Sequence, residues 1–300
     1  MTMKCCAWDI RIDGRLLRVA RLYADSYKFL DDPEPVIEGL RICRQRIDLF
    51  TFMQKLPDTS PKYRYPMEWD NFAALPVSTY DAWWTQQINN KTRNMVRRAV
   101  KMGVELREMP FGDALVEGIW KIYNECPIRQ GRPFRHYGKD IETVRREAAT
   151  FLDSSIFIGA FLDDSLIGFA KLVIDETRTQ AGVMHILSMI QQRDKASTNA
   201  LIAQAVRSCA ERGIPYLVYL NFLFRKDQRH SLHDFKVHNG FRRIDLPRYY
   251  VPLTRAGRIA FCLGLHHRFV DHFPESVLTQ ARKLRSAWYN RRYQTVTHAP

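Results

Sequence analysis

Alternating apolar and polar residues open the chain and predict strands. Residues 7–22 alternate around the turn dipeptide Asp13-Gly14, a pattern typical of a hairpin. Residues 33–45 have a helical pattern, residues 47–53 that of another strand, and residues 56–66 form a polar connection that contains proline. We therefore expect a strand-rich unit at the start of the chain.

The next hundred residues mix helical and strand patterns. Ser78 and Asp81 resemble a capping pair, and apolar residues then recur on one helical face as far as Met102, which predicts one long helix ending at Gly103. Residues 104–109 alternate as a strand, while residues 113–123 and 140–152 are helical in pattern. An irregular basic and aromatic loop, residues 126–139, separates those two helices.

Three long apolar stretches predict the centre of a sheet. They cover residues 155–162, 165–175 and 182–190, and a tight turn at Asp163-Asp164 joins the first two. A helix over residues 198–212, a buried strand over 216–222, a short helix over 231–238 and a strand that ends near residue 253 follow. The expected fold class is α+β, with a central mixed sheet flanked by helices.

Composition narrows the class of protein. The chain has 300 residues, 46% hydrophobic, and 46 Lys and Arg against 32 Asp and Glu, a net charge of +14. That charge suits a phosphate-bearing cofactor, a tRNA or a membrane surface, although it also serves solubility. No stretch has the length of a membrane span and the first residues lack a signal-peptide core, so we expect a cytoplasmic protein without integral membrane insertion. The six cysteines are scattered and are expected to be reduced thiols.

Two local patterns resemble a known family. From residue 155 to 253 the predicted order of strands and helices is that of the catalytic core of the GNAT superfamily. More specific are K-x-R-N-x-x-R-x-A-x-K-x-G-V from Lys91 to Val104 and S-L-x-x-F-K-x-x-N-G-F from Ser231 to Phe241. Both resemble FemAB-like (BioF2-like) acyltransferase domain proteins. The resemblance implies a transferase domain over residues 76–254, a partial duplicated half over 1–75, and a basic helical extension over 255–300.

This resemblance implies an enzyme of the EC 2.3 class. It would move an acyl or aminoacyl group from a phosphate-bearing thioester or tRNA ester to an amine on a small molecule or a cell-envelope precursor. The donor would be an acyl-CoA such as acetyl-CoA, or an aminoacyl-tRNA, and the superfamily's glycine-rich pyrophosphate pattern is absent. Two alternatives are a non-catalytic GNAT-fold protein that binds nucleic acid or RNA, given the basic residues of 91–107, and peripheral membrane attachment through the C-terminal segment.

The resemblance also places the donor site. GNAT enzymes hold the donor pyrophosphate on backbone N–H groups at the start of the helix after the central strand, where the helix dipole favours anions. Residues 193–201 occupy that place here, with Thr198 or Asn199 as the expected helix cap and two cations nearby. The expected donor-binding residues are Arg193, Lys195, Ser197, Thr198, Asn199 and Ala200.

The loop over residues 126–139 corresponds to the superfamily's acceptor-recognition segments. Arginines in such a loop can grip a carboxylate or phosphate with both nitrogens. The expected acceptor-binding residues are Arg129, Gln130, Arg132, His136 and Tyr137.

Amide formation needs a group that accepts a proton from the attacking amine. The catalytic candidates are His136, Tyr219 and Tyr250, with His185 and Asp175 as further proton acceptors. The chain has neither a nucleophile-elbow pattern nor H-E-x-x-H, which argues against a serine or metal hydrolase. His266, His267 and His272 have no cysteine or acidic cluster beside them in sequence, so we expect no metal site.

Overall fold

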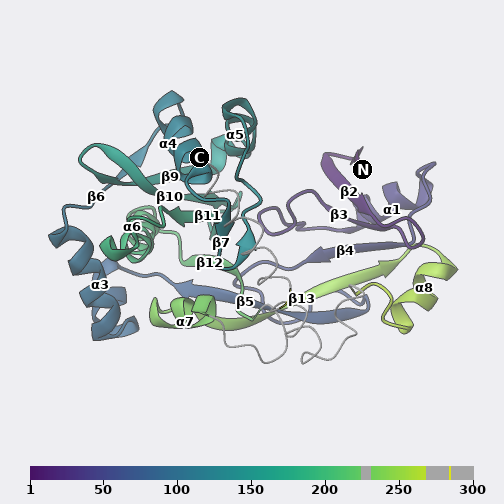
Figure 1. Ribbon diagram of the computed structural model, residues 1–300. Helices are drawn as coiled ribbons and strands as arrows, with labels where there is room; N and C mark the ends of the chain where they lie inside the picture. Colours follow the sequence, from purple (N-terminus) through teal and green to yellow (C-terminus); the bar gives the residue numbers. More distant parts are fainter. Residues whose placement is uncertain (224–230, 268–283, 285–300) are drawn as a thin grey trace.

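A single mixed sheet runs through both halves of the molecule (Figure 1). The computed structural model describes residues 1–223, 231–267 and 284. Within them the sheet has 11 strands in the order β1-β2-β3-β4-β13-β5-β12-β11-β10-β9-β6. None of the described helices is long and apolar enough to cross a membrane.

The larger half contains six of these strands and most of the helices. Its strands are β5 (Met67–Pro76), β6 (Glu105–Met109), β9 (Ser155–Leu162), β10 (Ser165–Ile174), β11 (Ala181–Ser188) and β12 (Tyr216–Asn221). Neighbouring strands are antiparallel except β11 and β12, which are parallel. Long apolar runs are expected for strands that are covered on both faces, and β9 and β10 are almost wholly buried.

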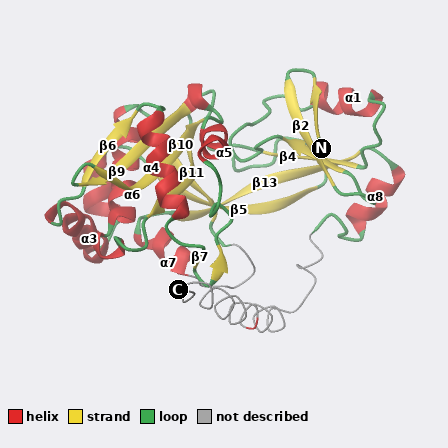
Figure 2. Cartoon of the chain, turned by 45° about the horizontal axis from the view of Figure 1, so that its top comes forward, coloured by secondary structure: helices red, strands yellow, loops and turns green. Residues whose placement is uncertain are grey.

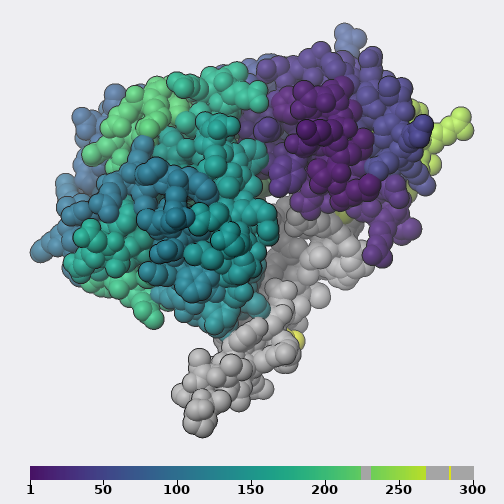
Figure 3. Space-filling model, turned by 90° about the horizontal axis from the view of Figure 1, so that it is seen from above, coloured from purple at the N-terminus to yellow at the C-terminus, as the bar shows by residue number. Residues whose placement is uncertain are grey.

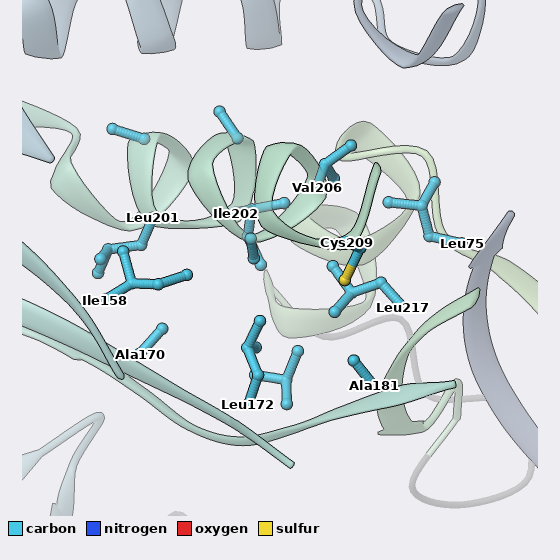
Figure 4. Close-up of a cluster of buried hydrophobic side chains, with 14 of the residues drawn as sticks. Leu75, Ile158, Ala170, Leu172, Ala181, Leu201, Ile202, Val206, Cys209 and Leu217 are labelled. Atoms are coloured by element: carbon cyan, nitrogen blue, oxygen red, sulfur yellow. The ribbon is translucent and has the colours of Figure 1, made fainter. Parts of the chain in front are cut away.

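Helices cover both faces of this half. The helices α3 (Asn90–Lys101) and α6 (Ser197–Glu211) cover the lower face in Figure 1, while α4 (Asp113–Asn124) and α5 (Ile141–Ala148) cover the upper face. Because side chains alternate along a strand, Ile158 and Ala170 point toward α6, whereas Phe157 and Phe169 point toward α4. The close-up in Figure 4 shows the α6 side of this core, where the helix side chains interlock with those of the sheet.

The smaller half comprises the start of the chain and one later helix. Its elements are β1 (Thr2–Cys5), β2 (Trp8–Asp13), β3 (Val19–Leu22), α1 (Glu34–Ile42), β4 (Leu49–Met53) and α8 (Arg255–Cys262). These elements have their own buried cluster, which includes Ile10, Ile37 and Phe50. Figure 3 shows the two halves packed side by side.

The two halves repeat the same topology. In each, three consecutive antiparallel strands lead through a crossover helix to a fourth strand that pairs in parallel with the third: β1-β2-β3-α1-β4 in the small half and β9-β10-β11-α6-β12 in the large one. The small copy has shorter strands and lacks counterparts of α4 and α5. A partial duplication, as expected from the sequence, would give this repeated topology.

One long strand connects the halves. β13 (Arg242–Pro252) pairs with β5 through Arg242–Tyr249 and with β4 through Arg248–Pro252, so it belongs to both (Figure 2). The boundary predicted at residues 75/76 falls at the end of β5, which pairs with both β12 and β13. Short elements complete the described chain: α2 (Tyr80–Ala82), η1 (Trp83–Gln87), β7 (Ile128–Arg129), β8 (Arg132–Pro133), η2 (Leu152–Ser154), η3 (Arg193–Lys195) and α7 (Ser231–His238).

The prediction of one long helix from Ser78 to Met102 is wrong. The helical segment begins one residue later, where the Thr79 hydroxyl accepts the N–H of Ala82 at 3.0 Å. It then passes through a π-helical turn and stops at Ile88, which is extended, before Asn89 caps α3. The apolar periodicity thus continues across a break in the backbone, and the capping side chain of Asn89 starts a second helix, α3.

Candidate functional site

The two parallel strands β11 and β12 separate soon after they meet. They pair only at Ala181–Leu217 and Gly182–Val218, although β11 continues to Ser188 and β12 to Asn221. Two irregularities accompany the separation: the β10–β11 register shifts beside Met184, and the β12–β5 register shifts after Val218. The backbone of β11 beyond Gly182 thus has no β12 partner and borders a gap between the strands.

The helix that follows β11 begins without a capping side chain. Its N-cap position is Ala196, which is left-handed at φ 55°, and no side chain among the described residues bonds to its first N–H groups. The expectation that Thr198 or Asn199 caps α6 is therefore wrong, because both lie within its first turn. The amides at the start of α6 have no side-chain cap and can attract an anion, and the Ser197 hydroxyl beside them is buried without a hydrogen-bond partner among the described residues.

The remaining predicted donor residues lie around this helix start. Arg193 and Lys195 belong to η3, directly before α6, where Lys195 contacts Asp194 at 3.2 Å. Ala200 is buried in the core, so only its backbone can face a ligand. The structure thus groups Arg193, Lys195, Ser197, Thr198 and Asn199 at the C-terminal end of β11, beside the gap.

The two family patterns meet in space beside the same helix. The Thr92 hydroxyl of the first pattern donates to the His238 carbonyl of the second at 2.8 Å. Asn239 contacts α6 through Asn199 at 3.4 Å, and its carbonyl accepts the indole N–H of Trp83 at 3.0 Å. These contacts hold α3 and α7 against the start of α6. The two patterns, far apart in sequence, therefore occupy one region of the fold.

A buried lysine of the second pattern lies at the end of β12. Lys236 is fully buried, and its Nζ donates to the Asn221 carbonyl at 2.6 Å and lies 4.6 Å from the centre of the Tyr219 ring. Burial lowers its pKa to about 8 and raises the pKa of Tyr219 to about 12. Lys236 was not among the site residues predicted from the sequence, although its place inside an apolar helix pattern was a signal for it.

Arg129 has a different setting from the one expected of an acceptor-binding residue. Its guanidinium donates to the carbonyls of Ser188 and Ile122 at 2.9 and 3.0 Å and pairs with Glu125 at 3.1 Å. Glu125 in turn accepts the N–H groups of Ile190 and Gln191. Arg129 is thus a fixed link between the end of α4 and the β11–α6 loop, near the start of α6.

The other predicted acceptor residues occupy the same loop. Gln130 and Gly131 form the left-handed turn between β7 and β8, while Arg132 and Tyr137 are exposed. An acceptor role for Gln130, Arg132 and Tyr137 stays a prediction.

Two histidines lie close together on the α4–α5 face. His136 is buried, stacks on Tyr123 at 4.3 Å between ring centres, and lies 6.0 Å from the His185 ring of β11. Lys139 lies 3.2 Å from the His136 Nδ1, and it also pairs with Glu147 at 2.5 Å. Burial is the main cause that lowers the pKa of both histidines to about 4, and neighbouring cations add to it. Both are therefore neutral at pH 7.

A second buried lysine stands directly across the ladder from His185. Lys171 of β10 pairs in register with His185, and its Nζ donates to the Ala148 carbonyl at 2.9 Å and to that of Thr150. Burial lowers its pKa to about 8. Together with its two acceptors, Lys171 fixes the end of α5 over β10.

The small half contributes an aromatic residue at the point where the strands separate. The ring of Tyr27 covers Gly182, so closely that a Cβ there would lie 2.7 Å from it. Tyr27 and Phe151, with ring centres 6.2 Å apart, also line a cavity of about 480 Å³ between the halves. Side chains of both charges complete its wall: Lys28, Asp153, Asp175, Glu176 and Arg178.

The three predicted catalytic residues do not form one group. Tyr250 pairs in register with Thr51 of β4 and contacts Phe261 and His266, all away from α6. The Tyr250 N–H donates to the carbonyl of Pro66, just before β5 and six residues before Phe72, which pairs with Asn221 of β12. Six extended residues span about 20 Å, so Tyr250 lies about that far from the end of β12. His136 lies on the α4–α5 face and Tyr219 lies beside Lys236, whereas Tyr250 is partly buried in the small half, against Phe261 of α8.

Solved structures with the same architecture exist, although their sequences differ widely. The C-terminal domain of a protein described as a lysylphosphatidylglycerol synthetase from Agrobacterium fabrum aligns with a TM-score of 0.57 at 13% identity, over 88% of this chain and 86% of its own. L-PGS from Bacillus licheniformis gives 0.56 at 13% identity, over 85% and 84%, and FemX gives 0.50 at 10%, over 80% and 83%. No family model matches the sequence, and neither does any curated protein.

The topology and these likenesses together define the fold. The chain has the GNAT fold in a tandem arrangement, and FemX is among the structures that share this architecture. This outcome confirms the fold class expected from the sequence.

Proposed function

We propose that the protein is an N-acyltransferase that moves an acyl or aminoacyl group from a phosphate-bearing ester or thioester to an amine. The observation that carries the proposal is the gap between β11 and β12 with an uncapped helix start at its mouth. Unpaired helix amides attract phosphate, and a gap between two strands accepts an extended chain beside unpaired backbone. The start of α6 would hold the phosphates, and the acyl end would reach inward along β11.

The donor and acceptor would enter from opposite ends. Ser197 and Thr198 mark the donor end, whereas Tyr27 closes the gap at Gly182, where the strands still pair. The 480 Å³ cavity beyond Tyr27 has the size of a small-molecule site. Because carboxylates and cations both line it, it suits an amine that also carries an anionic group.

The chemistry would need little beyond positioning and one proton acceptor. The amine nitrogen forms a bond to the acyl carbon while the carbon–sulfur or carbon–oxygen bond of the donor breaks. The proton lost from the nitrogen passes to a base and ends on the leaving thiolate or alkoxide. Neutral His185 on β11, next to the register shift at Met184, is the base that we favour, since proton acceptance requires the neutral imidazole. Unpaired backbone N–H groups of β11 would stabilise the oxyanion.

The exposed cations on α3 help to distinguish between the two candidate donors, acyl-CoA and aminoacyl-tRNA. Lys91, Arg97, Arg98 and Lys101 are exposed and form no ion pair with any described residue, and α3 packs against α6. Arg97 also lies over the Trp84 ring, 5.6 Å from its centre. Such a face beside the donor helix would suit the backbone of a tRNA. We therefore favour aminoacyl-tRNA over acyl-CoA as the donor.

Thermal stabilisation by acetyl-CoA, a longer acyl-CoA and aminoacyl-tRNA tests this choice, because a ligand that binds the native state raises Tm. We expect aminoacyl-tRNA to raise Tm more than the uncharged tRNA does. Equal shifts with charged tRNA, uncharged tRNA and unrelated RNA would support a non-catalytic RNA-binding protein instead. A shift with acyl-CoA alone would make the α3 cations irrelevant to the donor.

A further inference from the structure

Three side chains from distant parts of the chain converge on one point of the small half. The Glu68 Oε1 lies 3.0 Å from the His266 Nε2 and 3.1 Å from the His267 Nε2. Glu68 belongs to β5, and the two histidines belong to the turn that follows α8. All three ligand-type atoms lie within 4.8 Å of one another.

The spacing fits the coordination shell of a zinc-class ion. Zinc binds imidazole nitrogen and carboxylate oxygen at about 2.0–2.2 Å with tetrahedral geometry, which separates neighbouring ligand atoms by about 3.3 Å. The two nitrogen–oxygen distances are close to that value. Two imidazoles and one carboxylate favour zinc, cobalt or nickel over calcium or magnesium, which prefer oxygen ligands.

One histidine is held in place and the other two ligands can be reached from solvent. The His266 side chain is only 2% exposed, and the rings of Tyr250 and Phe261 lie 4.6 and 4.8 Å from it. Glu68 and His267 are 35% and 42% exposed. A fixed ligand with two accessible ones provides both a preformed geometry and an entry path for the ion.

We propose that Glu68, His266 and His267 bind a divalent zinc-class ion that fastens the turn after α8 to β5. Hydrogen bonds to a single carboxylate anchor this turn more weakly than three metal–ligand bonds. The proposal differs from the expectation of no metal site, which rested on histidines without a nearby acid. Glu68 precedes His266 by 198 residues and reaches it only in the folded chain. His272, the third histidine considered there, lies outside the described residues.

The test is metal binding by the untagged, full-length protein after treatment with a chelator. Zinc titration by calorimetry should give one site per chain, and cobalt should produce the visible absorption of a tetrahedral complex. Glu68→Gln and His267→Ala should each weaken zinc binding by about 10- to 100-fold. His238→Ala is the matched control, since it removes a histidine elsewhere and should leave the affinity unchanged. Zinc should also raise the Tm of the wild type and of the control, but not of the two ligand variants.

Two results would overturn the proposal. Absence of zinc binding by the wild type would reduce the three residues to a hydrogen-bonded cluster. Binding that His238→Ala weakens as much as His267→Ala does would place the metal elsewhere. Circular dichroism of the exposed-site variant His267→Ala shows whether the protein is folded in each titration.

Discussion

The hydroxyl groups of Ser188 and Thr198 lie 2.9 Å apart, so a hydrogen bond joins the last residue of β11 to the first turn of α6. Arg129 contacts the carbonyl of the same Ser188 from the other side. The loop between the strand and the helix is therefore fixed at both ends. A fixed loop holds the uncapped amides of α6 at the mouth of the strand gap, where a donor phosphate would bind.

Replacing Arg193 and Lys195 together by Ala should weaken binding of the donor. Each cation would contribute a charge-assisted contact to phosphate, and loss of both should lower the affinity about tenfold or more. Isothermal titration with the donor found by thermal stabilisation measures the effect. The control variant Lys4→Ala/Arg44→Ala removes two exposed cations from the small half and should bind as the wild type does. Equal loss in both double variants would mean that only net charge matters.

Arg129→Lys should destabilise the protein, because a lysine cannot reach all three acceptors of the guanidinium. The expected cost is about 1–3 kcal/mol in free energy of unfolding. Because Arg129 supports Ser188, donor affinity should also fall. Arg132→Lys, at an exposed position of the same loop, is the control and should keep wild-type stability in urea denaturation. A stable Arg129→Lys with a raised acceptor KM would restore the acceptor role expected from the sequence.

Gly240→Ala should be more destabilising than Gly138→Ala. Both glycines have positive φ, 90° and 79°, so both variants carry backbone strain of about 1 kcal/mol. At Gly240 the new Cβ would also lie 3.1 Å from Leu75 and 3.3 Å from Gln87, whereas at Gly138 no atom lies within 4 Å. Thermal melts of the two variants separate strain from crowding. Equal Tm values would show that the turn before β13 has room for a side chain.

Acid should destabilise the protein through His136 and His185. The pKa of each is about 4 in the folded protein against an ordinary value of 6.5, so the unfolded chain binds more protons between these values. Their contribution to stability is therefore complete above about pH 6.5 and is lost as the pH falls toward 4. His185→Gln should flatten this part of the stability profile in urea titrations. A profile unchanged by His185→Gln would mean that this histidine is not held neutral.

The sequence predicted best where apolar runs are long and local. The strands at 155–162, 165–175 and 182–190 correspond to β9, β10 and β11, with ends that differ by at most two residues. β5 was missed because Met67–Pro76 mixes Glu, Asp and Asn with apolar residues and has no clear alternation. β5 nevertheless lies in the middle of the sheet, between β12 and β13. These two strands provide apolar contacts that the sequence of β5 alone does not predict.

The candidate site was predictable only in part, for a similar reason. The start of α6 follows from local pattern and from the family resemblance, and it was placed correctly within one residue. Tyr27 reaches Gly182 across some 150 residues of chain, and Glu125 reaches Ile190 across 65. Such contacts leave no local periodicity. The opposite charges of Glu125 and Arg129, four residues apart, were the one local signal for that network.

Ser197 provides the most direct measurement of the central claim, that a phosphate-bearing donor binds at the start of α6. The residue is 1% exposed, and its hydroxyl has no hydrogen-bond partner among the described residues. Ser197→Ala should leave the Tm of the ligand-free protein equal or slightly higher, because no hydrogen bond is lost. We predict that aminoacyl-tRNA or acyl-CoA raises the Tm of the wild type and binds Ser197→Ala at least severalfold more weakly in titration calorimetry. Equal affinity of the two proteins for the donor, or no binding of either donor class to the wild type, would contradict the account.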